Sequence, residues 1–129
     1  MEQKKQLLNL FKNKIMNYTI DATNKSLGRL ASEVASILNA KNSIDFVKNR
    51  VADVSVKIVN ASKVKVTGNK MNVSVHKSYS GYPGGLKEMP LKYVAEKKGF
   101  SEVIRHAVYG MLPKNRLQDV RIKNLTIEE

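Results

Sequence analysis

The sequence contains no cysteine and only two histidines. A chain without cysteine forms neither disulfides nor thiolate metal sites, which suits a reducing compartment. The histidines, His76 and His106, have no second potential ligand at helical spacing, so the sequence predicts no zinc site. We therefore expect neither a metal nor another cofactor.

Long hydrophobic runs are also missing. No stretch approaches the ~18 apolar residues of a membrane-spanning helix. The N-terminal segment MEQKKQLLNLFKNKI interrupts its apolar positions with lysines and a glutamate, whereas a secretory signal needs an unbroken apolar core. We expect the protein to have no membrane partner and to stay in the compartment where it is made.

Acidic residues are scarce relative to basic ones. The chain has 23 Lys and Arg against 11 Asp and Glu, a formal charge of +12 at pH 7. Residues 54–87 hold six lysines and no acid, and lysines alternate with apolar residues in VSVKIV and SKVKV. Such an excess favours a polyanion as the partner, nucleic acid ahead of a membrane surface.

The length of 129 residues suits one domain with a single hydrophobic core. We interpret residues 1–16 as an N-terminal extension that could contain a short helix at 5–14. Residues 17–129 are then one α/β domain.

Hydrophobic periodicity predicts a strand, a helix and a strand in succession. The sequences NYTID at 17–21 and VSVKIVNA at 54–61 are typical of strands, and the segment 26–41 carries a helical apolar stripe behind Ser26 as N-cap. A further alternation at 64–68 predicts another strand. Two helices are expected to follow, PLKYVAEKKG opened by Pro90 and closed by Gly99, and FSEVIRHAVYGML ended by Gly110. This order favours a three-layer α/β/α sandwich with a mainly parallel, about four-stranded sheet.

A nucleotide-dependent enzyme is one alternative for such a fold. Dinucleotide folds place G-x-G-x-x-G between the first strand and helix, but DATNKSLG offers only Gly28 there, and no Walker loop is present. Tyr93 and Lys97 match the Y-x-x-x-K spacing of short-chain dehydrogenases, with Ser80 upstream. About one such spacing is expected by chance in a chain with many lysines. We therefore predict no catalytic residue and no small-molecule substrate.

The stretch HKSYSGYPGGLK at 76–87 combines three glycines and a proline with two lysines. Glycine permits backbone angles that a Cβ forbids and lets another molecule approach the main chain. Beside an acid-free run of lysines, this composition favours a loop that contacts the phosphates of a nucleic acid.

Three long stretches, taken together, resemble one protein family. They are DATNKSLGRLAS at 21–32, VNASKVKVTGNK and SYSGYPGGLK within 59–87, and AVYGMLPKN at 107–115. In this order and spacing they closely resemble the L13 family of large ribosomal subunit proteins, over roughly residues 17–127. The resemblance implies an α/β sandwich with a parallel sheet, no catalysis, and a place on large-subunit ribosomal RNA, where the family helps assembly and then remains as architecture.

The resemblance and the residue chemistry together suggest an RNA-binding surface. Glycines would let the loop lie against folded RNA, lysines would neutralise phosphates, and Tyr79 and Tyr82 would stack on a base or ribose or else brace the loop. For Arg29, a phosphate contact and a solvated side chain are equally good interpretations. The predicted RNA-binding residues are Arg29, Lys70, His76, Lys77, Tyr79, Tyr82, Gly84, Gly85, Lys87, Lys114, Asn115, Arg116, Arg121 and Lys123.

Two further local expectations concern turns. Gly68, Asn69 and Lys70 are interpreted as a tight turn that ends a hairpin, with the lysine reaching outward. Where the family usually continues with Leu-Gly-Arg after Met-Leu-Pro, this chain has Leu117, Gln118 and Asp119, an amide and an anion in place of a turn glycine and a cation.

The expected partners are large-subunit ribosomal RNA and neighbouring large-subunit proteins. The expected location is the large ribosomal subunit, in the cytoplasm or in an organelle. Three alternatives stay open at this point: an RNA-binding regulator acting on messenger RNA, a small nucleotide-dependent α/β enzyme, and a membrane-surface protein.

Overall fold

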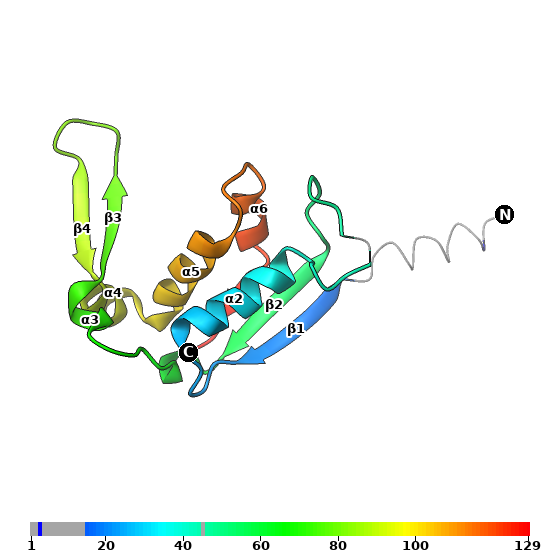
Figure 1. The fold of residues 1–129 in the computed structure, drawn as a ribbon, viewed down its shortest axis with the longest axis horizontal. Helices are drawn as coiled ribbons and strands as arrows, with labels where there is room; N and C mark the ends of the chain where they lie inside the picture. Colours follow the sequence, from blue (N-terminus) through cyan, green and yellow to red (C-terminus); the bar gives the residue numbers. More distant parts are fainter. Residues whose placement is uncertain (1–2, 4–14, 45) are drawn as a thin grey trace.

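The computed structural model describes residues 3, 15–44 and 46–129. Figure 1 shows an α/β body from which a two-stranded hairpin projects at one end. The expected helix at 5–14 lies outside the described residues. Within the described ranges, no helix has the length and hydropathy needed to cross a membrane.

Three parallel strands form the main sheet, in the order β1, β2, β5. They are β1 at Met16–Asp21, β2 at Val54–Val59 and β5 at Leu125–Ile127. In this register Tyr18 lies opposite Val56 on the neighbouring strand. The predicted α/β class with a parallel sheet is confirmed.

The sheet has three strands instead of about four. The expected strand at 64–68 makes only a single parallel bridge, between Lys65 and Ser26. Val64 is buried in the main core, so the alternation in this segment comes from a short stretch that packs against the core beside α2 without joining the sheet. The third strand is instead β5, whose three residues are too few to show a periodicity.

Helix α2 (Leu27–Leu38) connects β1 to β2. Ser26 occupies the predicted N-cap position with extended backbone angles, although its hydroxyl makes no capping hydrogen bond. The residues that repeat at helical spacing, Leu30, Val34 and Leu38, are buried in the main core. The predicted apolar stripe is therefore the face that packs on the sheet.

Helices α4 (Leu91–Lys98) and α5 (Phe100–Met111) follow the hairpin. As predicted, Pro90 is the N-cap of α4, and Gly99, with φ of 81°, separates the two helices. The expectation that Gly110 ends a helix is wrong, because α5 continues through it to Met111. A shorter helix α6 (Gln118–Ile122) follows α5, and a 3-10 turn η1 (Ala61–Lys63) follows β2.

The two faces of the sheet differ. Val56 and Ile58 are fully buried in the cluster that α2 and α5 complete. On the other face Thr19, Lys57 and Thr126 lie in one row across the three strands, and all three are exposed. The second helical layer of the predicted sandwich is therefore not seen among the described residues.

The projecting hairpin consists of β3 (Val75–Tyr79) and β4 (Leu86–Pro90), paired antiparallel. Half of the stretch predicted as a loop, at 76–79 and 86–87, is thus strand, and only its glycine-rich centre at 80–85 is a connection. At its foot lies α3 (Lys70–Val73). The predicted hairpin ending at Lys70 is wrong, because Gly68 and Asn69 lead directly into α3.

Candidate nucleic-acid interface

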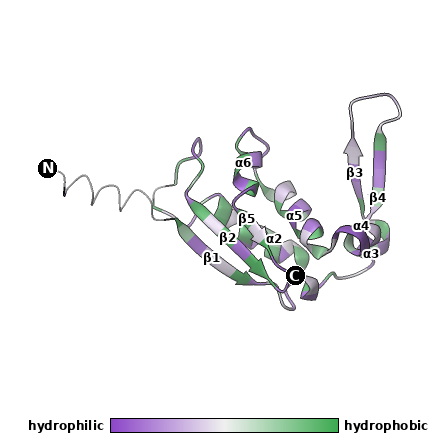
Figure 2. Cartoon of the chain, turned by 180° about the vertical axis from the view of Figure 1, so that it is seen from behind, coloured by the Kyte–Doolittle hydropathy of each residue, from purple (hydrophilic) through white to green (hydrophobic). Residues whose placement is uncertain are grey.

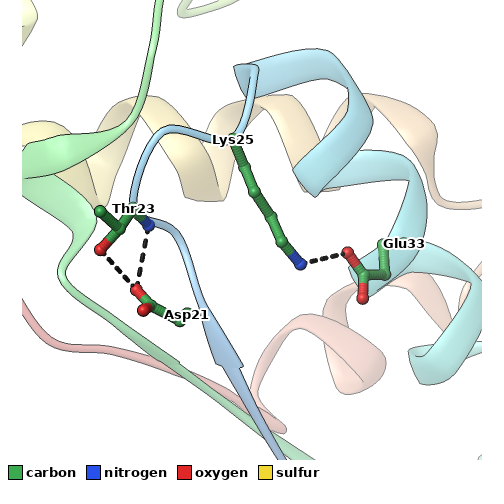
Figure 3. Close-up of polar contacts among 4 residues, drawn as sticks. All are labelled: Asp21, Thr23, Lys25 and Glu33. Carbon is green, nitrogen blue, oxygen red and sulfur yellow. Dashed lines mark hydrogen bonds and ion pairs between the residues drawn. The ribbon is translucent and has the colours of Figure 1, made fainter.

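Polar contacts hold the turn between β1 and α2 (Figure 3). The Asp21 carboxylate accepts hydrogen bonds from the Thr23 backbone N–H at 3.0 Å, from the Thr23 hydroxyl at 2.7 Å and from the Asn60 amide at 3.1 Å. These bonds, those from Thr23 foremost, lower the pKa of Asp21 to about 2. Lys25 pairs with Glu33 of α2 at 2.9 Å. The turn fixes the position at which α2 begins.

A hollow with a volume of about 450 Å³ opens beside the N-terminus of α2. We call it the basic hollow, because its charged lining residues are Arg29, Lys65 and Lys70, with no acid among them. Its other lining residues are Ser26, Leu27, Gly28, Ser32, Val66, Thr67 and Met111. The structure thus brings together two predicted RNA-binding residues, Arg29 and Lys70, that are far apart in the sequence.

Lys65 is a member of this hollow that the prediction missed. Its backbone explains its place: the Lys65 N–H donates to the Lys25 carbonyl at 2.9 Å, and the Leu27 N–H donates to the Lys65 carbonyl at 3.1 Å. The available signal was its place in the acid-free lysine run, but nothing in the sequence distinguished it from its neighbours.

The electrostatics of the basic hollow favour an anion. The N-terminus of a helix carries partial positive charge, and the first turn of α2 holds no acidic residue to offset it. Space beside Gly28 is open, because a Cβ built there would meet no atom within 4 Å. A phosphate could therefore approach the start of α2 closely while three cationic side chains surround it.

The end of α5 reaches the same hollow. The Ser32 hydroxyl lies 3.2 Å from the Met111 sulfur, and the loop at 112–117 leaves from this point. Within the loop, Asn115 accepts a hydrogen bond from the Leu117 N–H at 3.1 Å, so its side chain shapes the turn. The side chains of Lys114 and Arg116 are exposed.

The departures from the family pattern at 118 and 119 make contacts within the protein. The Gln118 amide donates to the Tyr109 carbonyl at 2.6 Å, and Asp119 accepts a hydrogen bond from the Tyr109 hydroxyl at 3.0 Å. The latter contact raises the pKa of Tyr109 above its ordinary value. The amide and the anion therefore join α6 to α5.

Arg121 and Lys123 have different surroundings. Arg121 is only 3% exposed, and its guanidinium donates to the Lys48 carbonyl at 3.4 Å. The sequence grouped Arg121 with surface cations, but α6 turns it inward, where it does not add to an exposed basic patch. Lys123 is exposed, as expected.

The hairpin displays aromatic and charged side chains at its tip and along its strands. Tyr79 and Tyr82 are 63% and 75% exposed. Lys77 forms an ion pair with Glu88 across the strands at 3.1 Å. The two charges offset each other, so the pair attracts a distant anion less than Lys77 alone would. Lys87 is exposed and forms no ion pair within the described part of the chain. The hairpin is therefore less strongly cationic than its sequence suggested.

The glycines of the hairpin turn have two different roles. Gly81 and Gly84 have φ of 86° and 73°, a region that favours glycine. The Gly85 N–H donates to the Tyr82 carbonyl at 3.0 Å, and a Cβ on Gly85 would overlap the Ser80 hydroxyl. The close approach that requires glycine at position 85 is made by the loop itself, whereas the sequence interpretation assigned it to RNA.

His76 connects the hairpin to the body. Its ring stacks on that of His106 in α5, with ring centres 3.8 Å apart and planes inclined by 25°. Burial, then the neighbouring His106, lowers the pKa of His76 below its ordinary value. His76 is among the predicted RNA-binding residues, whereas in the structure its ring packs on another residue of the same chain.

Comparison with known proteins agrees with the sequence resemblance. Residues 15–128 match the family model of ribosomal protein L13. The large ribosomal subunit protein uL13 of Syntrophomonas wolfei is 44% identical over 110 residues, which are 85% of this chain and 76% of the relative. Those of Thermoanaerobacter sp. strain X514 and Aquifex aeolicus are each 46% identical with the same coverage. Such relatives are structural proteins and not enzymes, so the enzyme alternative is set aside. The chain belongs to the ribosomal protein L13 family.

Proposed function

We propose that this chain binds large-subunit ribosomal RNA and supports assembly of the large subunit in the cytoplasm. It then remains in the assembled subunit beside neighbouring ribosomal proteins. The observation that carries the proposal is the basic hollow, where Arg29, Lys65 and Lys70 surround the N-terminus of α2 without an acid. Lysines, arginines and helix N-termini are the groups that hold phosphates in nucleic-acid complexes.

The hairpin supports the same conclusion. A two-stranded hairpin is marginally stable in water without a packing partner. Figure 2 shows this one standing apart from the body, with hydrophobic and hydrophilic residues mixed along its strands. Tyr79, Tyr82 and Leu86 are each more than half exposed. A folded RNA that covers the hairpin would bury these side chains and stack on the tyrosines.

Exposed cations connect the basic hollow to the hairpin on one side and to the loop at 112–117 on the other. Lys70 begins α3 at the foot of the hairpin, and Lys114 and Arg116 follow the end of α5 at Met111, which lines the basic hollow. We propose that phosphate contacts run from the hairpin through the basic hollow to the loop at 112–117. Recognition of this kind depends on phosphate positions and RNA shape.

The test neutralises the basic hollow. The triple variant Arg29→Gln, Lys65→Gln, Lys70→Gln is compared with the parent for binding to a large-subunit ribosomal RNA transcript at several salt concentrations. Each phosphate contact contributes roughly 0.7 to 0.9 to the slope of log affinity against log salt. We expect the slope of the variant to be shallower by about two to three, and less of the variant to co-sediment with large subunits.

The control carries the same change of charge elsewhere. Lys92, Lys97 and Arg105 are exposed on α4 and α5, and none of them lines the basic hollow. Their replacement by Gln should leave the slope of log affinity against log salt close to that of the parent. Equal slopes for the parent and the test variant would exclude the basic hollow from the RNA interface. Recovery of the protein on messenger RNA in place of large subunits would favour an RNA-binding regulator.

A further inference from the structure

A second, smaller hollow lies at the opposite end of α2. It has a volume of about 250 Å³ and is bounded by the residue that follows α2, by residues 46–48, by the loop at 112–117 and by α6. We call it the α6 hollow. None of its lining residues belongs to the basic hollow, so it is a separate feature of the surface.

Two residues that line this hollow each carry a buried polar atom that has no partner in the part of the chain that the structure describes. The atoms are Oδ1 of Asn39, an acceptor, and Nε of Arg121, a donor. The two residues are 9% and 3% exposed. The Arg121 guanidinium also donates to the Lys48 carbonyl at 3.4 Å, which holds it next to another lining residue. Buried polar atoms are almost always paired, so two unpaired atoms on residues that line the same hollow point to a ligand that pairs with them.

The rest of the lining consists of two apolar residues, two lysines and Asn115. Phe46, 39% exposed, and Pro113 provide flat apolar surface, and Lys41 and Lys48 are exposed. The volume exceeds the ~150 Å³ of an apolar cavity that admits benzene. The α6 hollow therefore has room for a planar ring, with cations next to it.

We propose that the α6 hollow receives one unstacked nucleobase of the bound RNA, an inference that rests on the proposed function. The ring lies against Phe46, and the base edge pairs with Asn39 and Arg121. The flanking phosphates lie near Lys41 and Lys48. A phosphodiester alone does not fit, because it offers only acceptors and would leave the Asn39 oxygen unpaired, whereas a base edge offers both a donor and an acceptor.

The first experiment replaces the stacking ring. The variant Phe46→Ala is compared with Phe46→Tyr, which keeps a ring, for binding to the large-subunit ribosomal RNA transcript. Loss of one base stack lowers affinity by about 5- to 150-fold. We expect that loss for Phe46→Ala and near-parental affinity for Phe46→Tyr. The salt slope should not change in either variant, because stacking on an uncharged ring releases no counterions.

Ile44→Ala is the matched control. Ile44 is two residues earlier, is fully exposed and does not line the hollow. Its truncation should leave the affinity unchanged. A second measurement does not depend on affinity: a photoreactive benzophenone side chain at position 46 should cross-link to one nucleotide of the bound RNA.

Parental affinity of Phe46→Ala, or cross-links scattered over many nucleotides, would overturn this proposal and indicate a water-filled hollow. In that case salt-dependent binding by the parent protein would leave the proposed function intact. Failure of the parent protein to bind the transcript at all would overturn both.

Discussion

At the residue scale, Asp21 shows how one side chain fixes a turn at the edge of the interface. Its three hydrogen bonds hold the pKa at about 2, below the ordinary value of 3.8. A carboxyl whose pKa is lower in the folded state adds stability above pH 3.8, and this stability is lost as pH falls from 3.8 through about 2. The turn should therefore weaken only in strong acid.

We predict that Asp21→Ala lowers the melting temperature at pH 7, and that the difference from the parent shrinks as pH falls from 4 toward 2. Thermal denaturation followed by circular dichroism at several pH values checks this. Asp53, which is exposed, provides the control substitution Asp53→Ala, with little effect expected. A difference between parent and Asp21→Ala that persists unchanged at pH 2 would exclude the carboxylate as its source.

Gly85 is a second single residue on which the shape of the hairpin turn depends. Because a Cβ there would overlap Ser80, we predict that Gly85→Ala distorts the hairpin turn and weakens RNA binding while the body stays folded. Gly110→Ala is the contrasting change, since a Cβ at this position of α5 meets nothing within 4 Å. Adding it should stabilise the protein by about 0.5–1 kcal/mol. Amide NMR spectra and melting curves of both variants check the two expectations.

At the element scale, hydrophobic periodicity predicted the elements that bury one face against the core. The stripe that includes Leu30 and Val34 defined α2, because burial of one helical face requires that spacing. The alternation around Lys65 looked like a strand because one side of that segment is buried, although it meets its neighbour at a single bridge. The hairpin strands were missed because both of their faces are largely exposed, so no period of two marks them.

We expect the contact between β3 and α5 to depend on pH. Burial and His106 lower the pKa of His76, Lys98 lowers it further, and Glu102 opposes them. A histidine whose pKa lies below 6.5 when docked takes up a proton more readily when undocked. The stack is therefore complete above pH 6.5 and weakens as pH falls below 6.5 through the lowered pKa.

We predict that the hairpin amides become less protected against hydrogen exchange as pH falls below 6.5. Protection is compared after correction for the intrinsic exchange rate, which itself changes with pH. His76→Phe keeps an aromatic ring in β3 that can pack against α5 but cannot titrate. This variant should therefore lose the pH dependence of hairpin protection. His106→Phe should bring the pKa of His76 closer to its ordinary value, which an NMR titration measures. Identical pH profiles for the parent and His76→Phe would show that the stack does not control hairpin docking.

At the scale of the whole molecule, the grouping of residues at the proposed interface is a product of topology. Arg29 and Lys70 meet because α2 begins beside the segment that leads to α3, and no local pattern encodes that meeting. Likewise, the burial of Arg121 follows from the orientation of α6, while its sequence neighbours Val120 and Lys123 are exposed. Sequence could identify the lysine-rich composition and the family, but the grouping of charges required the fold.

The same topology divides the hydrophobic residues into two clusters. The larger one joins the sheet to α2 and α5, with Ile58 and Ile104 fully buried. The smaller one, Leu91, Val94 and Val103, lies where α4 meets α5 beside the hairpin. Because Val103 and Ile104 are adjacent on α5, this helix connects the two clusters. The smaller cluster has far fewer buried residues, so we expect it to open more readily than the sheet.

We predict that Val94→Ala accelerates hydrogen exchange in the hairpin, α3 and α4 far more than in β1 and β2. Ile58→Ala, in the larger cluster, should lower the free energy of unfolding by about 2–5 kcal/mol and accelerate exchange throughout the chain. Tyr93→Phe is the control, since Tyr93 is half exposed beside Val94 and its hydroxyl has no assigned role. Exchange that rises equally in all elements of Val94→Ala would mean that hairpin and body unfold as one unit, and RNA would then dock a rigid protein. Exchange confined to the hairpin end would instead mean that the elements carrying Tyr79 and Tyr82 open separately from the sheet.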